Sequence, residues 1–452
     1  MKTKKEQVLD NGIISGVIWQ QLLLYFFPLL FGTFFQQLYN TVDAVIVGRF
    51  VSKEALAAVG GSSATLVNLY VGFFIGMSSG ATVIIAQFYG AGRKEEVSRS
   101  VHTAIAMAIA GGVLFMLAGF ITAPWAIHMM KTPTDTVAGS VLYLRIYFCG
   151  MIPNLVYNVG AGILRAVGDS KRPLYVLIIS CFANIVLDMF FVLQMHMGIA
   201  GVAIATILCQ MISALLVMGI LMRSEDCYRL VLRKIRIDTD MLGKIIHIGL
   251  PSGIQSMMYT ISNLLIQASI NGFQTDAVSA WAAYGKIDSV YWMIISSLGI
   301  SITTFVGQNY GAGRYARVRK SVRQCFGISV AFTVSLSTVL MLYGQYLYVL
   351  FTTDKSVMKI GTEMMHYLVP FYITYIGIEM FSGALRGMGD SIVPMALTIG
   401  GVCVLRVLWI LTAVPVNHQI TTVIASYPIT WSITSILFFV YYEWFVRRHR
   451  IK

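Results

Sequence analysis

The stretch Gln87-Phe-Tyr-Gly-Ala-Gly-Arg93 occurs again as Gln308-Asn-Tyr-Gly-Ala-Gly-Arg314, 221 residues further along the chain. The same offset places Leu164-Arg165 on Leu385-Arg386 and Gly168-Asp169-Ser170 on Gly389-Asp390-Ser391. An accidental match would not keep one register from residue 87 to residue 173. The chain therefore contains a duplicated unit.

The composition places this duplicated chain in a lipid bilayer. Its 452 residues are 57% apolar and 12% charged, whereas about 25% of the residues of a water-soluble domain are charged. A membrane helix takes about 20 apolar residues, so this content is enough for about a dozen spans. These values exclude a soluble enzyme, a disordered chain and a secreted disulfide scaffold. The net charge of +13 comes from short basic runs between apolar stretches, which argues against a nucleic-acid-binding face.

Twelve apolar stretches are bounded by charged residues or by Gly and Pro. They begin near residues 17, 55, 101, 138, 173, 199, 243, 277, 325, 361, 392 and 420. Sorting the 33 basic residues among the connections places 25 on one side of the membrane and five on the other. Because basic residues concentrate in cytoplasmic loops, both termini are expected in the cytoplasm and the chain in the plasma membrane, a cell inner membrane.

The predicted fold class is therefore an all-α integral membrane protein with 12 transmembrane helices in two six-helix bundles. An even number of helices in each half makes the halves parallel, related by a pseudo-two-fold axis along the membrane normal. We expect an N-terminal lobe at 1–223, a cytoplasmic linker at 224–240 and a C-terminal lobe at 241–452. Two such bundles leave a cleft that can open to either face, an architecture suited to alternating access.

Acidic side chains inside the membrane are costly unless paired, hydrated or neutralised, so they are functional candidates. Four lie within the predicted spans: Asp43, Asp188, Asp288 and Glu379. The repeat aligns Asp43 with Ile266 and Asp188 with Trp409. A polar cluster that occurs in one half alone is not explained by the fold that both halves share, which favours a functional role.

Asn184 and Asp188 are four residues apart, so they share one face of a helix. Asp43, Asn158 and Thr206 lie on three other spans and could complete an oxygen-rich pocket. Oxygen ligands of this kind suit Na⁺, at Asp43, Asn184, Asp188 and Thr206, or a proton held between the carboxylates. The alternative is a satisfied polar cluster that only fixes helix packing. No organic cofactor is expected.

The candidates for a substrate cleft are acids and soft or aromatic side chains, which suit flat cations through apolar and cation–π contacts. They are Glu379, Asp288, Met257, Tyr259, Tyr284 and Trp292. The alternative for each is an ordinary core or lipid-facing residue.

Pro28 removes one backbone hydrogen bond from the first span, which permits a bend. We hypothesise that protonation of Asp43 or Asp188 lets this helix bend and reshapes the substrate pocket. A static kink is the alternative, and Pro251 at the matching place in the second half favours it.

Several motifs occur in an order and spacing that resembles the multidrug and toxic compound extrusion (MATE) family. They are Pro28, Tyr39-Asn-Thr-Val-Asp43, Gln87-Phe-Tyr-Gly-Ala-Gly-Arg93, Leu164-Arg165, Gly168-Asp169-Ser170 and Asn184-Ile-Val-Leu-Asp188, within the 6+6 repeat. The resemblance covers essentially the whole chain. It implies a secondary antiporter that uses a proton or Na⁺ gradient to export amphipathic, often cationic, organic compounds by alternating access of two lobes, and so confers drug resistance.

The resemblance also implies roles for single residues. Asp43, Asn158, Asn184, Asp188 and Thr206 match the positions of the cation and proton site in prokaryotic members with acids in the N-terminal lobe. Another branch of the family carries coupling acids in the C-terminal lobe. This chain departs from that pattern at Tyr259, and Glu379 is displaced by about a turn.

Other functions fit the sequence less well. A flippase for a lipid-linked saccharide would prefer a cationic cleft and often has fourteen spans. An intramembrane enzyme would need a catalytic arrangement within a span, and the His residues are scattered. A channel would show a repeated pore loop. The expected partners are small organic cations or amphipathic drugs and the bilayer, with no nucleic acid, and the expected state is a monomer.

Overall fold

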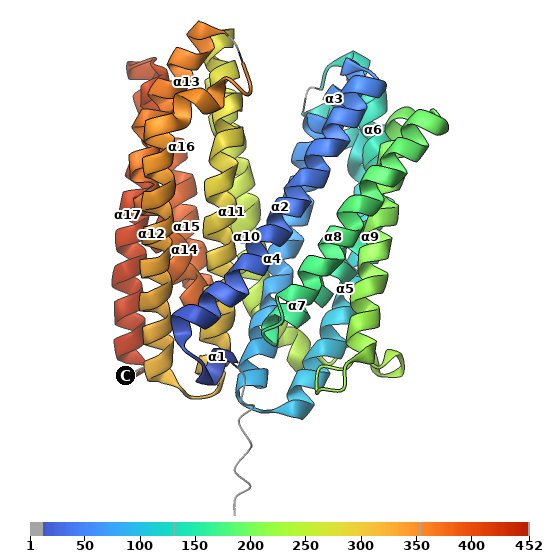
Figure 1. Ribbon diagram of the computed structural model, residues 1–452, viewed down its shortest axis with the longest axis vertical. Coiled ribbons are helices and arrows are strands. Elements are labelled where there is room, and N and C mark those ends of the chain that lie inside the picture. The colour runs from blue at the N-terminus through green and yellow to red at the C-terminus, as the bar shows by residue number, and fades with distance from the viewer. Residues whose placement is uncertain (1–11, 131, 353, 451–452) are drawn as a thin grey trace, which may run out of the picture. The chain divides into compact units, whose positions relative to one another are not determined.

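The computed structural model describes residues 12–130, 132–352 and 354–450, and these residues are almost entirely helical (Figure 1). The elements of the first half are α1 (Gly12–Ser15), α2 (Ile18–Phe50), α3 (Lys53–Gly60), α4 (Ser62–Gly90), α5 (Lys94–Met129), α6 (Thr134–Cys149), α7 (Met151–Ala166), α8 (Lys171–Asp188), η1 (Met189–Gln194), α9 (Gly198–Arg223) and η2 (Leu232–Lys234). Those of the second half are α10 (Thr239–Ile270), α11 (Thr275–Gly311), α12 (Tyr315–Tyr348), α13 (Lys355–Leu368), η3 (Val369–Phe371), α14 (Tyr372–Gly387), α15 (Ile392–Thr398), η4 (Ile399–Val404), α16 (Leu405–Val416) and α17 (Ile420–Arg448).

Elements that are separated only by a short break belong to one pass, and the described residues then form twelve long helical passes. This number confirms the predicted helix count. Ten of the passes are long and apolar enough to cross a membrane, and the α6–α7 pair, bent by 52°, makes an eleventh. The twelfth, α10, has 32 residues, which at about 1.5 Å per residue gives about 48 Å. Helix α10 carries polar side chains such as Gln255 and Asn263 and is not among the helices that are apolar enough by themselves. The chain is therefore a multi-pass membrane protein.

The described residues form two compact units. The first comprises Leu24–Gly253, and the second comprises residues 12–23 and 254–450. Two helices, α2 and α10, contribute residues to both units. The lobe boundaries near residues 223 and 241 stay a prediction.

Glycine pairs pack the first part of α10 against α4 in the first unit. A Cβ added at Gly80 would lie 2.3 Å from the carbonyl oxygen of Ile245, and one added at Gly249 would lie 2.4 Å from that of Met77. Gly76 approaches the backbone at Gly253 in the same way, since its Cβ would lie 2.5 Å from the Gly253 nitrogen. Small residues let membrane helices approach to backbone contact, so this contact explains why residues 239–253 pack with the first half.

The turns of the sequence repeat have matching backbone conformations. Gly92 and Gly313 have φ angles of 71° and 69°, and Gly168 and Gly389 have φ angles of 96° and 101°. These left-handed conformations are strained for residues with a Cβ. The repeated glycines are therefore needed to form the turns.

The connection between the two halves is tied to the first unit. Arg99 of α5 donates a 2.9 Å hydrogen bond to Asp238, and its guanidinium also forms an ion pair with that carboxylate at 2.7 Å. This hydrogen bond holds the pKa of Asp238 below its usual range. The backbone N–H of Val231 donates to His102 Nε2 at 3.0 Å. Residues 224–238 are thus a folded connection.

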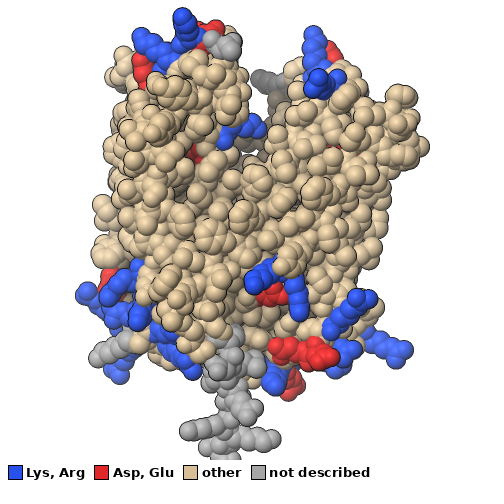
Figure 2. All heavy atoms as spheres, in the orientation of Figure 1, with Lys and Arg blue, Asp and Glu red and all other residues tan. Residues whose placement is uncertain are grey.

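Charged side chains gather near the ends of the helices, and the visible surface between them is largely uncharged (Figure 2). This distribution fits helices that cross a hydrocarbon layer.

Candidate functional site

Asp43 and Asp188 come together inside the first unit, as the sequence predicted. Asp43 lies in α2 and is 9% exposed, and Asp188 is the last residue of α8 and is fully buried. The two carboxyl groups lie within hydrogen-bonding reach of each other. The Asn184 side chain reaches the Asp43 carboxyl from the preceding turn of α8. Two acids and one amide therefore meet at one buried point.

Several polar side-chain atoms at this point have no hydrogen-bond partner. Five buried atoms form no hydrogen bond within the described residues: Asp43 Oδ1, both carboxylate oxygens of Asp188 and both amide atoms of Asn184. Two ionised carboxylates cannot donate to each other, so close approach alone satisfies neither of them. Buried groups of this kind are costly. The cluster therefore offers oxygen ligands for a cation or a shared proton, and either one would satisfy these buried atoms.

A cavity of about 140 Å³ lies beside this acid pair in the first unit. Asn184 lines it, and so do Asn158 of α7 and Thr206 of α9. The Asn158 amide donates to the Asn154 carbonyl at 2.9 Å and to its side-chain oxygen at 3.1 Å. The Thr206 hydroxyl donates to the Val202 carbonyl at 3.0 Å. Asn158 and Thr206 thus form the wall of the cavity, and Asn184 connects that wall to the acid pair.

The fold of α8 explains why Asn184 and Asp188 face the same way. They are one helical turn apart on the buried face of α8. Directly after Asp188 the helix changes to the π-helical segment η1. Such segments widen a helix locally and often occur at functional sites.

The sequence analysis missed several side chains around the acids. Tyr39 and Tyr143 lie within electrostatic range of Asp43. Cys209 lies near both acids and within hydrogen-bonding reach of Asn184. Tyr39 stands four residues before Asp43 on the same helix, so helical spacing alone identifies it as a neighbour. Tyr143 and Cys209 come from other helices, and no local spacing points to them.

In the second unit, Asp288 lies among aromatic side chains. Trp292 Nε1 donates to its carboxylate at 2.5 Å, and the Tyr372 hydroxyl donates to it as well. The Tyr284 hydroxyl lies 2.8 Å from that of Tyr372. The ring of Trp431 lies 6.0 Å from that of Trp292. The structure thus brings together three of the predicted cleft residues, Asp288, Tyr284 and Trp292, and adds Tyr372.

Two of the other predicted cleft residues, Glu379 and Tyr259, share the partner Tyr375. The Tyr375 hydroxyl donates to Glu379 at 3.5 Å and lies 3.4 Å from the Tyr259 hydroxyl. Glu379 packs against Gly299 of α11, where a Cβ would lie 2.1 Å from its carboxylate oxygen. Met257 is half-buried on α10. Glu379 and Tyr259 are therefore joined through Tyr375.

Pro28 lies inside α2, which is helical from Ile18 to Phe50 on both sides of it. The position thus fits a proline within a continuous helix, and the proposed hinge role stays a prediction.

No group of three or more His, Cys, Asp and Glu side chains that could hold a metal occurs in the described part of the chain. The acid pair with Asn184 instead offers two carboxylates and an amide. This set fits a monovalent cation or a proton better than a transition metal.

Comparison with known proteins places the chain in a family. The family model MatE matches residues 28–190 and 251–412, once in each half. The chain is 25% identical to the probable multidrug resistance protein YoeA of Bacillus subtilis, over 100% of this chain and 99% of the relative. It is 24% identical to the probable multidrug resistance protein NorM of Thermotoga maritima, over 84% of this chain and 82% of the relative.

Solved structures show the same fold. A transporter of the MOP superfamily from Pyrococcus furiosus has a TM-score of 0.88 at 22% identity and covers 100% of this chain and 98% of its own. An outward-facing multidrug resistance MATE family transporter gives a TM-score of 0.87 at 22% identity, with the same coverage. Together with the family match to both halves, these likenesses confirm the predicted fold class. The chain therefore belongs to the MatE family of multidrug efflux transporters, as the resemblance in its motifs indicated.

Proposed function

We propose that this protein is a cation-coupled antiporter that exports amphipathic organic cations across the plasma membrane. The observation that carries the proposal is the pair of buried acids, Asp43 and Asp188, of which Asp43 Oδ1 and both Asp188 oxygens form no hydrogen bond within the described residues. A proton or Na⁺ bound between them removes the repulsion of two like charges, and Asn184 supplies a further oxygen. The proposal invokes no other cofactor, and it takes both termini to be cytoplasmic on the distribution of basic residues.

Binding of the coupling ion removes the electrostatic repulsion between the two carboxylates in the first unit. Two like charges about 4 Å apart repel by about 4 kcal/mol at an effective dielectric constant of about 20. A ligand shifts a conformational equilibrium only through its different affinities for the two states. The acid pair is suited to this role because its charge depends on occupancy. Since Asp43 and Pro28 lie in the same helix α2, a change at the pair acts directly on the proposed hinge.

The substrate class follows from the second unit and from the relatives. Asp288 provides one negative charge, and Trp292 and Tyr372 provide aromatic faces beside it. Aromatic rings with an adjacent carboxylate attract organic cations. The relatives named above are described as probable multidrug resistance proteins, which fits a broad range of amphipathic cations.

The proposal is tested by transport in reconstituted vesicles. A fluorescent organic cation is loaded, and pH and Na⁺ gradients are imposed separately. We expect efflux to follow one of the two gradients, and Asp43→Asn or Asp188→Asn to abolish this coupling while the purified protein stays folded. Asp135→Asn, at an exposed acid of α6, is the matched control and should transport normally. Efflux that ignores both gradients contradicts the proposal, as does unchanged coupling in both acid variants.

A further inference from the structure

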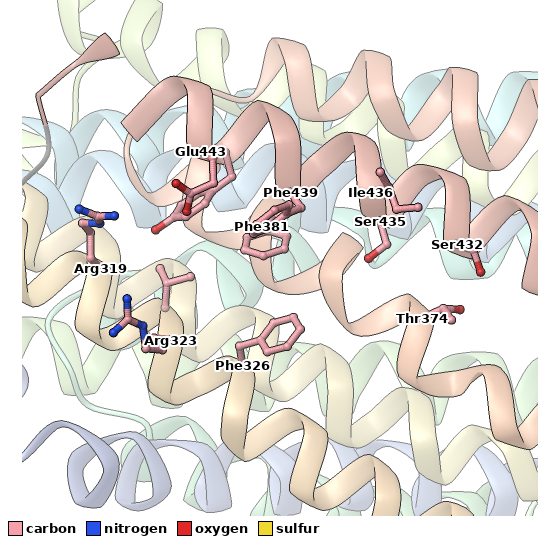
Figure 3. A pocket seen from close by; sticks show the side chains of 12 residues that line it. Arg319, Arg323, Phe326, Thr374, Phe381, Ser432, Ser435, Ile436, Phe439 and Glu443 are labelled. Carbon is pink, nitrogen blue, oxygen red and sulfur yellow. The ribbon is translucent and has the colours of Figure 1, made fainter. Parts of the chain in front are cut away.

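A groove in the second unit runs between α12, α14 and α17 and has a volume of about 520 Å³ (Figure 3). Its charged residues lie at one end: Arg319 and Arg323 on α12, and Glu443 opposite them on α17. The rest of the groove is mainly apolar. Neither arginine has a carboxylate within 4 Å among the described residues, whereas Glu443 has Arg447 at 3.8 Å. The charged end therefore carries a net positive charge.

Aromatic rings form the body of the groove. The Phe326 and Phe381 rings stack with centroids 5.8 Å apart, and Phe381 also contacts Phe439 at 5.7 Å and Tyr442 at 5.0 Å. Phe439 is 51% exposed and Ile436 is 62% exposed, although both lie in the membrane-spanning helix α17. The groove thus opens toward lipid.

The length of the groove matches one leaflet. Ser432 and Glu443 both line it and are eleven residues apart on α17, which corresponds to about 16 Å at about 1.5 Å per residue. Half of a bilayer's hydrocarbon core is about 15 Å thick. A cationic end followed by an apolar trough of this length has the form of a phospholipid, with its phosphate at one end and an acyl chain along the rest.

The corresponding position in the first half is covered by the connection, and the cavity of about 370 Å³ there is lined by charged residues such as Glu95, Arg99 and Asp238. The repeat aligns Arg319 with Ser98 and Arg323 with His102, and His102 accepts a hydrogen bond from Val231 of the connection. Phe381 corresponds to Gly160, where an added Cβ would lie 2.2 Å from the Val217 side chain. Within the described residues, the second half therefore has an apolar trough beside its arginines where the first half has a charged cavity, and shared scaffolding does not account for that trough.

We propose that this groove binds an anionic glycerophospholipid of the cytoplasmic leaflet, with its phosphate between Arg319 and Arg323 and one acyl chain over Phe326, Phe381 and Phe439. The charged end is the one that the distribution of basic residues assigns to the cytoplasm. Basic residues near a membrane surface each contribute roughly 1 kcal/mol to anionic-lipid binding, equivalent to about a fivefold change in affinity for each arginine.

The test is lipid titration of the purified full chain in detergent, followed by native mass spectrometry. Phosphatidylglycerol is compared with phosphatidylethanolamine and phosphatidylcholine. We expect phosphatidylglycerol to bind most tightly, and Arg319→Ala and Arg323→Ala each to weaken it about fivefold. Lys320→Ala is the matched control, because it removes the same charge from the next position of α12 without lining the groove. It should change the affinity less than twofold.

Two further variants separate the parts of the groove. Glu443→Gln removes the opposing negative charge and should strengthen phosphatidylglycerol binding. Ser432→Phe fills the trough and should weaken binding although both arginines remain. The proposal is overturned if phosphatidylethanolamine or phosphatidylcholine binds as tightly as phosphatidylglycerol. It is also overturned if the double variant of Arg319 and Arg323 binds phosphatidylglycerol as well as Lys320→Ala does.

Discussion

Replacing Gly249 by alanine tests the close contact between α4 and α10 in the first unit. The new Cβ would lie 2.4 Å from the carbonyl oxygen of Met77 and 3.2 Å from its Cα. Ordinary Cβ contacts begin near 3.4 Å, so the helices have to separate by about 1 Å. Because the obstructing atoms belong to the backbone, no change of side-chain rotamer can relieve the overlap.

The expected cost follows from two opposing terms. Overpacking of this kind destabilises a protein by about 1–3 kcal/mol. Alanine in a helix interior is more favourable than glycine by up to about 1 kcal/mol. Gly243 lies on the same helix with nothing within 4 Å of an added Cβ, so Gly243→Ala gains the second term without the first. Because both variants gain the helix-propensity term, they should differ in stability by the overpacking term alone, about 1–3 kcal/mol.

The assay is thermal unfolding of the purified protein in one detergent, followed by the loss of the monodisperse peak in size-exclusion chromatography. Gly249→Ala should unfold at a lower temperature than the parent protein, and Gly243→Ala at the same or a higher temperature. Gly80→Ala should behave like Gly249→Ala, since its Cβ would lie 2.3 Å from the Ile245 carbonyl. Equal unfolding temperatures for Gly249→Ala and Gly243→Ala would refute the reasoning.

Three further predictions concern the connection and the aromatic cluster. Arg99 lowers the pKa of Asp238, so the stabilisation is complete above the unfolded pKa of about 3.9 and is lost as the pH falls through the lower folded value. The protection factors of residues 224–238 against hydrogen exchange should therefore fall below about pH 4. His102→Ala removes the acceptor for Val231 and should speed tryptic cleavage of the connection, and unchanged cleavage would contradict this. Tyr372→Phe removes a donor to the half-buried Asp288 carboxylate and should lower stability by about 1–3 kcal/mol in thermal unfolding.

Much of the fold could be predicted because local sequence determines it. Helix length follows from the apolar stretches, and the turns follow from glycines that the repeat places twice. Gly92 and Gly313 illustrate this, since their φ angles differ by only a few degrees, at 71° and 69°. The hydropathy pattern is least direct for α10, which is not among the helices that are apolar enough by themselves, although its 32 residues are enough to cross a bilayer.

The candidate site could be predicted where one helix carries its residues. Asn184 and Asp188 share a face of α8 because they are four residues apart. The repeat aligns Asp43 with the apolar Ile266 of the second half, and this difference identified Asp43 as a further candidate. Tyr372 could not be predicted as a partner of Asp288, because it lies 84 residues away in the chain. Such a contact depends on how α11 and α14 pack, and no helical periodicity encodes that.

The duplication itself forces the two halves to differ. A chain with two repeats has a single connection between them, so a connection that folds onto one repeat leaves the equivalent surface of the other uncovered. His102 and Leu221 hold this connection in the first unit, through Val231 and Leu230. The equivalent positions in the second half are Arg323 and Tyr442, and both line the open groove. A histidine such as His102 accepts a backbone hydrogen bond, and it would have no such donor on a surface that faces lipid. An arginine such as Arg323 can instead pair with a lipid phosphate at that position. The substitution of arginine for histidine is thus the change expected where a membrane component takes the place of the chain's own connection.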